Sequence, residues 1–461
     1  MSNGLLPSRT PGCIPLVPVA ESEFGAWLEQ QDESTRRWLA ATGFKARPGS
    51  FSPAPGPDGQ LRRVIAGIAS ANDLWALGSL PTNLPEGDYV LDAALDPRQR
   101  ERLTLGWALG AYQFTRYKAP KRAMAWLVLD PACDVGRIQR QVEAVTLARD
   151  LVNTPAEDLM PEHLAEVTQA LGREFGANVE QIVGEELLTR NYPVIHAVGR
   201  ASSHPPRLLD LRWGDPTHPK VTLVGKGVCF DSGGLDLKPS NAMRLMKKDM
   251  GGAATALGLA RLIMGSGLPL RLRVLIAAVD NAVAGNAFRP GDVLRSRQGL
   301  TIEVHNTDAE GRLILSDALT EAGSEQPVVM LDFATLTGAA RVALGPEIPA
   351  LFCNDEALAV GLLAAAEREQ DPFWRLPLHQ PYREMLDSKI ADIANASESS
   401  YAGAITAALF LKEFVPAGLP WAHFDLMAWN SKTQPGRPEG GEAMALRAVF
   451  AWLEQRYGGG E

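Results

Sequence analysis

Cysteine is scarce in this 461-residue sequence, which contains only four: Cys13, Cys133, Cys229 and Cys353. They are scattered and form no Cys-x-x-Cys pair, which argues against a disulfide framework and against a zinc site built from thiolates. This usage fits a reducing compartment, so we expect a cytoplasmic protein. Blocks of lysine and arginine are missing as well, and the formal net charge is −9. Such a balance does not favour a surface for nucleic acid or for anionic membranes.

Long apolar runs and two common catalytic motifs are also absent. No uncharged apolar stretch reaches the length that a membrane span requires, and residues 1–12 lack the apolar core of a signal peptide. We therefore expect a soluble protein that does not contact membranes. The sequence has neither the His-Glu-x-x-His motif of many zinc peptidases nor the Gly-x-Ser-x-Gly motif of serine hydrolases.

Composition and length predict a multidomain globular protein. Hydrophobic residues make up 46% of the sequence and charged residues 21%, and a chain of 461 residues is too long for one compact core. Residues 130–136 predict a turn or linker, followed by an amphipathic linker helix over about 137–152. We place a domain boundary here. Residues 1–134 would form a smaller N-terminal α/β domain of unassigned role, and residues 135–461 a larger domain, which the motifs described below make the candidate catalytic domain.

Beyond the boundary, short apolar segments alternate with helical ones. Strands are predicted at residues 208–212, 221–224, 272–279, 328–333 and 422–426, and helices at 252–264, 313–322 and 402–414. This alternation predicts an α/β fold in which a mixed, mostly parallel sheet is flanked by helices. The acidic windows described next follow such strands, at the position where open α/β sheets bind ligands. In the N-terminal domain, the proline- and glycine-rich residues 45–60 predict a surface loop.

Carboxylates concentrate in short windows of the C-terminal region. Asp308 and Glu310 lie within Asn-Thr-Asp-Ala-Glu-Gly-Arg at 306–312, and Asp231 lies in a glycine-rich loop, with Asp249 downstream. On an extended segment, Asp308 and Glu310 point to the same side, which is unfavourable unless a multivalent cation lies between them. Each residue alone has an ordinary structural role, such as a turn former or a helix cap. Together they predict a divalent-metal site whose oxygen ligands suit Zn²⁺, Mn²⁺ or Mg²⁺.

These windows resemble the M17 leucyl aminopeptidase family of binuclear metallo-aminopeptidases. The family signature Asn-Thr-Asp-Ala-Glu-Gly-Arg stands intact at 306–312, and the similarity continues at 225–240, 246–250, 286–292, 334–338 and 376–378. A seven-residue identity of mostly polar residues is a specific signal. The resemblance spans most of residues 145–440, whereas residues 1–130 show no motif that we can match.

The resemblance implies five metal ligands: Lys226, Asp231, Asp249, Asp308 and Glu310. Asp231 and Glu310 would bridge two divalent ions, Zn²⁺ or Mn²⁺ with Mg²⁺ as a third option. Only a neutral amine coordinates a metal, so Lys226 would need a pKa depressed by the two cations. Two ions roughly 3.5 to 4 Å apart can hold a bridging hydroxide that attacks the scissile carbonyl, while one ion binds the free α-amine of the substrate.

The resemblance also implies catalytic and substrate-binding residues. Lys238 would stabilise the oxyanion, and Arg312 would hold a bicarbonate ion that carries a proton to the leaving amine. His305 is interpreted as a strand residue and not as a catalyst. Substrate contacts would come from Thr335, Leu336 and Gly338, largely through the main chain. Met246 would form part of the wall of the pocket for the N-terminal side chain.

The family further implies a homohexamer, a dimer of trimers whose active sites face an interior cavity that admits short peptides.

Three other interpretations of the function remain open. One is a dipeptidase of narrow specificity, such as one acting on Cys-Gly, because Met427 and Asn430 depart from the family's usual small-residue pattern. Another is a DNA-binding accessory protein of the same fold, which the acidic balance disfavours. The last is a metal-free scaffold, disfavoured because every mapped catalytic position is filled. The stretch at 436–442 also departs from the family's usual ending after its Gly-Arg-Pro, without a functional interpretation.

Overall fold

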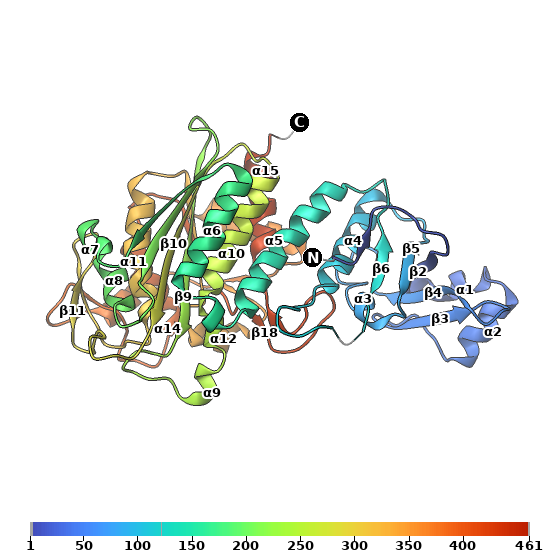
Figure 1. Ribbon diagram of the computed structural model, residues 1–461, viewed down its shortest axis with the longest axis horizontal. Helices are drawn as coiled ribbons and strands as arrows, with labels where there is room; N and C mark the ends of the chain where they lie inside the picture. Colours follow the sequence, from blue (N-terminus) through green and yellow to red (C-terminus); the bar gives the residue numbers. More distant parts are fainter. Residues whose placement is uncertain (1–2, 121, 460–461) are drawn as a thin grey trace. The chain divides into compact units, whose positions relative to one another are not determined.

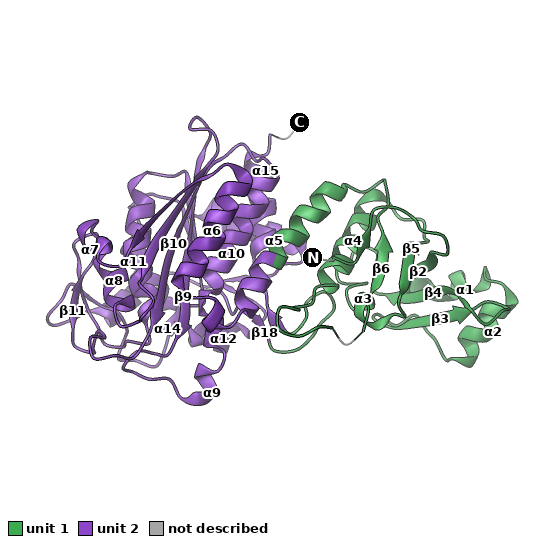
Figure 2. Cartoon of the chain, in the orientation of Figure 1, with its two compact units in different colours: residues 1–146, 431–439 green, residues 147–430, 440–461 purple. Residues whose placement is uncertain are grey.

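The computed structural model describes residues 3–120 and 122–459, coloured along the sequence in Figure 1. They form two compact units (Figure 2): unit 1 consists of Met1–Thr146 and Ser431–Glu439, and unit 2 of Leu147–Asn430 and Gly440–Glu461. The predicted architecture of mixed sheets with flanking helices in two domains is confirmed. The division at residue 146 falls inside helix α5 (Val135–Asn153), and the boundary proposed at residue 134 stays a prediction.

Unit 1 contains a six-stranded sheet in the order β1-β6-β5-β2-β4-β3. Its strands are β1 (Leu5–Leu6), β2 (Ile14–Ala20), β3 (Phe51–Pro55), β4 (Leu61–Ile68), β5 (Gly87–Leu91) and β6 (Ala125–Val128). Its helices are η1 (Glu21–Glu23), α1 (Phe24–Glu29), α2 (Glu33–Ala41), α3 (Leu80–Asn83), α4 (Pro97–Gly110) and the first part of α5.

The prediction that residues 45–60 form a surface loop is wrong in part. Phe51–Pro55 forms β3, which pairs antiparallel with β4 at the edge of the sheet. Pro53 and Pro55 are tolerated there because an edge strand leaves one row of its backbone groups without a strand partner. Proline content alone therefore did not distinguish an edge strand from a loop.

A segment remote in sequence completes unit 1. Residues 431–439 carry Gly436, whose φ is +70° and where an added Cβ would lie 2.2 Å from Cε3 of Trp75. The Arg437 guanidinium carbon lies 5.2 Å from the centroid of the Trp75 ring. Part of the uninterpreted stretch at 436–442 thus has a packing role against Trp75.

Unit 2 contains an eight-stranded mixed sheet in the order β15-β14-β17-β13-β9-β10-β8-β7. The central strands β17 (Trp421–Asp425), β13 (Val329–Ala334), β9 (Lys220–Asp231) and β10 (Arg271–Asn281) are mutually parallel. The outer strands are β7 (Asn178–Val183), β8 (Arg207–Trp213), β14 (Ala350–Cys353) and β15 (Trp374–Arg375). Two small sheets join β11 (Val293–Arg295), β12 (Thr301–Glu303) and β16 (Ile393–Ala394), and β18 (Trp429–Asn430) with β19 (Gly440–Gly441).

Helices cover both faces of this sheet, and Figure 1 shows α6 (Pro161–Phe175) and α10 (Gly251–Gly265) on one side with α8 (Pro193–Gly199) and α11 (Glu310–Ser324) on the other. The others are α7 (Glu186–Thr189), α9 (Ser240–Met243), α12 (Gly338–Leu344), α13 (Glu356–Glu369), α14 (Gly403–Lys412), α15 (Leu446–Tyr457), η2 (Ala156–Asp158), η3 (Met246–Met250) and η4 (Gln380–Leu386). Because both faces are covered, β9, β10 and β13 are almost wholly buried and are apolar along most of their length. Across the described ranges, no helix is long and apolar enough to span a membrane.

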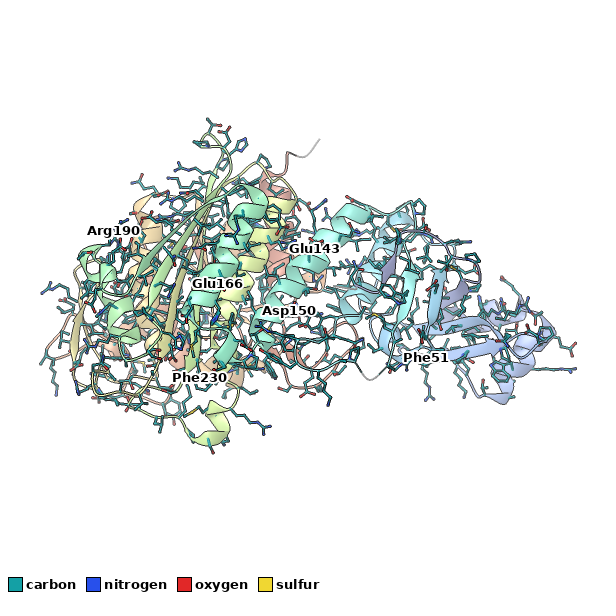
Figure 3. The ribbon with its side chains drawn as sticks, viewed as in Figure 1. Phe51, Glu143, Asp150, Glu166, Arg190 and Phe230 are labelled. Atoms are coloured by element: carbon teal, nitrogen blue, oxygen red, sulfur yellow. The ribbon has the colours of Figure 1, made fainter. Side chains whose placement is uncertain are left out.

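The parallel central strands end at one edge of the sheet. Asp231, Asn281 and Asp425 are the last residues of β9, β10 and β17. Figure 3 labels Phe230, the neighbour of Asp231, at this end of β9. Close packing fixes the next elements: an added Cβ on Gly252 of α10 would lie 2.0 Å from the Phe333 carbonyl oxygen. The tight contact of α10 with β13 holds η3, which precedes α10, at the same edge.

Candidate metal centre

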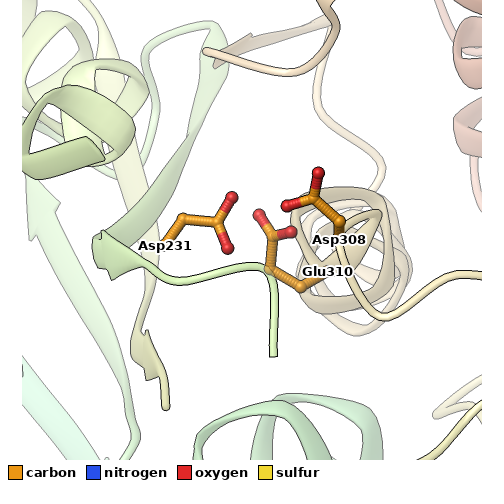
Figure 4. Close-up of side chains that lie close together, drawn as sticks. All are labelled: Asp231, Asp308 and Glu310. Carbon is orange, nitrogen blue, oxygen red and sulfur yellow. The ribbon is translucent and has the colours of Figure 1, made fainter. Parts of the chain in front are cut away.

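Three carboxylates converge at the edge of the sheet in unit 2. Asp231 ends β9, Asp308 lies in the loop before α11, and Glu310 is the first residue of that helix. One oxygen atom from each carboxylate lies within 4.8 Å of the others, and Figure 4 shows the side chains turned toward a common centre. Asp231 and Glu310 are buried, whereas Asp308 is partly exposed. This arrangement matches the oxygen-rich cluster that the sequence predicts.

Two lysines pair with these groups, and one of them also contacts a fourth carboxylate, Asp249. Nζ of Lys226, on β9, lies 2.6 Å from Oδ2 of Asp249 and 2.9 Å from Oε1 of Glu310. Nζ of Lys238 lies 2.8 Å from Oδ2 of Asp231 and also pairs with Asp308. Two ammonium groups therefore face four carboxylates, a formal charge of −2 within one cluster. This excess of negative charge favours the binding of divalent cations.

The pKa values of the acidic groups reflect this shortage of positive charge. Burial, together with the charge of Asp231, raises the pKa of Glu310 well above that of an ordinary glutamate. Burial likewise raises the pKa of Asp308 to about 6. For Lys226, burial would lower the pKa, but the charges of Asp249, Glu310 and Asp231 outweigh it and raise the pKa. A divalent cation at the centre would instead lower the pKa of all three groups. Lys226 requires such a lowered pKa if it is to bind a metal as a neutral amine.

Several oxygens of the cluster are buried without a hydrogen-bond donor in the part of the chain that the structure describes. They are Oδ2 of Asp249, Oδ1 of Asp308 and both oxygens of Glu310. Three of them lie at ion-pair distance from a lysine Nζ, whereas Oε2 of Glu310 has no such contact within the described ranges. Buried carboxylate oxygens are normally paired or bound to a metal. Among the described residues, only Oε2 of Glu310 lacks both kinds of partner, and that fits a metal-ligand role.

Neighbouring polar groups orient two of the carboxylates. Oδ1 of Asp231 accepts the Gly233 N–H at 2.9 Å and the Asn281 side-chain amide at 2.8 Å. The same amide donates to the Thr307 carbonyl oxygen at 3.1 Å. The Thr335 hydroxyl donates to Oδ1 of Asp249 at 2.8 Å. Partners of this kind fix the orientation of metal ligands. The sequence analysis did not predict Asn281 as a site residue. The one available signal was its position shortly after the apolar run 272–279, at the end of a predicted strand.

Arg312 lies on α11 two residues after Glu310 and is also buried. Its NH1 atom donates to the Asn395 carbonyl oxygen at 2.7 Å, while Nε has no hydrogen-bond partner among the described residues. Burial lowers the pKa of this guanidinium to about 10. A buried N–H without an acceptor fits a small anion, as the bicarbonate prediction requires.

The predicted substrate residues lie on segments that flank the cluster. Met246 begins η3, the element that carries Asp249, and its side chain is half-buried. Thr335 and Leu336 follow β13, and Gly338 begins α12 with open space where a Cβ would lie. The Thr335 carbonyl oxygen accepts the Lys226 ammonium at 3.0 Å, so this residue contacts two predicted ligands.

His305 lies outside the carboxylate cluster. Nδ1 is 3.0 Å from the Ala396 carbonyl oxygen, and Nε2 is 3.2 Å from Oε2 of Glu303. Its interpretation as a strand residue is wrong, because β12 ends at Glu303 and His305 follows in the loop. The backbone N–H of His305 bonds the Asn395 side chain instead of a neighbouring strand.

Comparison with known proteins identifies relatives over both units. A model described as the cytosol aminopeptidase family, catalytic domain, matches residues 146–450. A second, described as the M17 aminopeptidase N-terminal domain, matches residues 14–130, where we found no motif. A probable cytosol aminopeptidase of Syntrophotalea carbinolica is 42% identical over 398 residues, covering 82% of this chain and 78% of that protein. Peptidase B of Serratia proteamaculans is 44% identical over 335 residues, covering 71% and 77%.

Solved structures give the same picture. The crystal structure of a cytosol aminopeptidase from Coxiella burnetii has a TM-score of 0.96 at 50% identity, covering 99% of this chain and 100% of that chain. The bottromycin maturation enzyme BotP, solved in complex with Mn, has a TM-score of 0.84 at 36% identity, covering 96% and 99%. The similarity therefore extends over the whole length of the chain.

Proposed function

This chain belongs to the M17 cytosol aminopeptidase family, whose members are metal-dependent aminopeptidases, and from that premise we propose that it releases N-terminal residues from short peptides with two divalent metal ions. The observation that carries the proposal is the cluster of four carboxylates facing two lysines, with one buried oxygen of Glu310, Oε2, left without a hydrogen-bond or ion-pair partner among the described residues. The manganese complex of the related BotP supports Mn²⁺ as one candidate, beside Zn²⁺ and Mg²⁺.

The proposed ligands divide by position. Asp231 and Glu310 are the buried members of the converging trio and would bridge the two ions, while Asp308, Asp249 and Lys226 would complete the coordination. When bound, two divalent ions supply Lewis acidity at the scissile carbonyl and a water of lowered pKa as nucleophile, and one of them can take the free α-amine. Dependence on that amine is what distinguishes an aminopeptidase from an endopeptidase.

Two further residues would act on the reacting atoms. Asp231 and Asp308 hold the Lys238 ammonium beside the cluster, and we propose that it donates to the oxyanion that develops at the scissile carbonyl. The unpaired Nε of Arg312 would hold bicarbonate, a carrier for the proton that the leaving amine needs. We propose that Met246, Thr335, Leu336 and Gly338 contact the substrate.

The narrow dipeptidase reading loses one of the two departures that motivated it, while Met427 remains. Asn430, one of the two departures that motivated it, donates its side-chain amide to Oε2 of Glu442 at 2.8 Å. Glu442 also pairs with buried Arg149, whose NH2 atom lies 3.0 Å from the same oxygen. The departure at Asn430 therefore has a packing explanation that does not involve substrate.

Family resemblance supports a cytoplasmic homohexamer built as a dimer of trimers, and we propose that assembly here. A chain of 49.7 kDa would give a particle of about 298 kDa, six times the chain mass. Light scattering coupled to size exclusion measures this mass directly, and a mass of one or two chains would contradict the hexamer.

The test of the aminopeptidase activity compares matched substrates. Leu-, Met-, Ala- and Cys-Gly peptides would be offered with a free N-terminus and as N-acetylated forms. We expect turnover of the free-amine forms only, with a ranking of side chains that defines the specificity. Equal cleavage of acetylated peptides would contradict an aminopeptidase, and no turnover at all would favour a binding or scaffold role.

A further inference from the structure

The carboxylate of Asp425 ties down the segment that follows β13. Asp425 ends β17 and lies beside Ala334 in the parallel pair of β13 and β17. Its Oδ1 accepts the backbone N–H of Leu336 at 3.0 Å and of Thr337 at 3.1 Å. Its Oδ2 accepts the Thr337 hydroxyl at 2.6 Å. The residue is 3% exposed, so these bonds form away from solvent.

This segment links Asp425 to the metal centre. Thr335, directly before the two residues that Asp425 holds, bonds Asp249 through its hydroxyl and Lys226 through its carbonyl oxygen. On the other side, the Thr337 hydroxyl accepts the Ala340 N–H at 3.0 Å and so caps α12. The backbone between the metal centre and α12 is therefore fixed at every residue from 335 to 337.

We propose that Asp425 is a positioning residue for the peptide substrate, acting through Leu336 and Thr337. By fixing these two N–H groups and the Thr337 hydroxyl, it sets the main-chain direction of the segment that would bind the peptide backbone. This inference rests on the proposed function, since it concerns the same substrate segment. Because a backbone contact is made in both the ground state and the transition state, its disturbance raises KM more than it lowers kcat.

The chain offers a matched control of the same chemistry elsewhere in unit 2. Asp371 is also buried, and its carboxylate accepts three backbone N–H groups at the start of α15: Ala445 at 3.1 Å, Arg447 at 2.9 Å and Ala448 at 3.1 Å. Removal of either carboxylate orphans buried donors and lowers stability. Only Asp425 holds the proposed substrate segment, so only its removal should change KM.

The experiment measures KM, kcat, bound metal and Tm for wild type, Asp425→Ala, Asp425→Asn, Thr337→Val and Asp371→Ala with a free-amine leucyl dipeptide. We expect Asp425→Ala to raise KM about tenfold with unchanged metal content, and Thr337→Val, which keeps both backbone bonds, to raise it about threefold. Asp425→Asn keeps an acceptor oxygen for the two N–H groups and can donate its amide N–H to the Thr337 hydroxyl, so it should approach the wild-type KM. Asp371→Ala should lower Tm and leave KM unchanged.

Two results would overturn the inference: a folded Asp425→Ala with wild-type KM, or an equal rise of KM in Asp371→Ala. If Asp425→Ala does not fold, Thr337→Val decides, and an unchanged KM there overturns it. Failure of the proposed function looks different, because the wild-type protein itself would then cleave no free-amine peptide.

Discussion

Gly311 leaves the space that Lys226 occupies, and its replacement by alanine tests the geometry of the centre. An added Cβ would lie 2.5 Å from Cε and 2.7 Å from Nζ of Lys226. Ordinary contact begins at 3.4 Å, so Lys226 would have to move by about 0.9 Å, the difference between 3.4 and 2.5 Å. Its Nζ is held by Asp249, Glu310 and the Thr335 carbonyl, so this movement displaces a proposed ligand.

The expected changes in stability and activity of Gly311→Ala follow from two opposing effects. Alanine inside a helix is more favourable than glycine by about 0.8 to 1 kcal/mol, so Gly311→Ala should still fold. A misplacement of roughly 1 Å at a reacting centre can cost about 100-fold in rate. We therefore expect kcat/KM to fall about 100-fold and metal affinity to fall about 10- to 100-fold, with Tm nearly unchanged.

The assay pairs this variant with Gly25→Ala in α1, where an added Cβ meets nothing within 4 Å. Bound metal after dialysis against graded chelator, kcat/KM on a leucyl dipeptide and Tm would be measured for both. Gly25→Ala should match wild type in all three. If Gly311→Ala keeps wild-type metal affinity and kcat/KM, the argument that Lys226 must stay in place is wrong.

Three further predictions concern the candidate metal centre and the eight-stranded sheet of unit 2. Glu310→Ala should abolish metal binding and turnover together, whereas Lys238→Ala should lower kcat about 10²- to 10³-fold with metal retained; metal loss from the Lys238 variant would contradict its role. For His423, burial would lower the pKa, but the charge and hydrogen bond of Asp332 raise it above 6.5. Its stabilising contribution is then complete below about pH 6.5 and is lost as pH rises through the folded pKa. The difference in free energy of unfolding between wild type and His423→Gln should shrink as pH rises above about 6.5, and a constant difference would refute this reasoning.

Much of the fold and of the carboxylate cluster could be predicted because the signals were local. The apolar runs at 221–224 and 272–279 became parts of β9 and β10, since strands buried on both faces require uninterrupted apolar sequence. The two acidic windows, separated by over fifty residues, meet because parallel strands end at one edge of the sheet and α11 begins there. Motif residues at strand ends were therefore informative.

The residues that the sequence could not reveal act through register and long-range packing. Asn281 and Asp425 belong to none of the matched motifs, and their role depends on which strands are neighbours in the sheet. Gly436 packs against Trp75, a pairing between positions more than three hundred residues apart that no periodicity encodes. The edge strand over Phe51–Pro55 was missed because its prolines are typical of loops.

The central claim, that this chain uses two divalent ions to cleave peptides with a free N-terminus, is tested most directly by metal stoichiometry measured together with activity. Chelator-stripped protein would be titrated with Zn²⁺, Mn²⁺ or Mg²⁺ while bound ions per chain and turnover of a leucyl dipeptide are recorded. We predict no turnover without metal and full turnover when two ions are bound per chain. Undiminished turnover in the stripped protein, or a chain that binds no ion and cleaves nothing, would contradict the account.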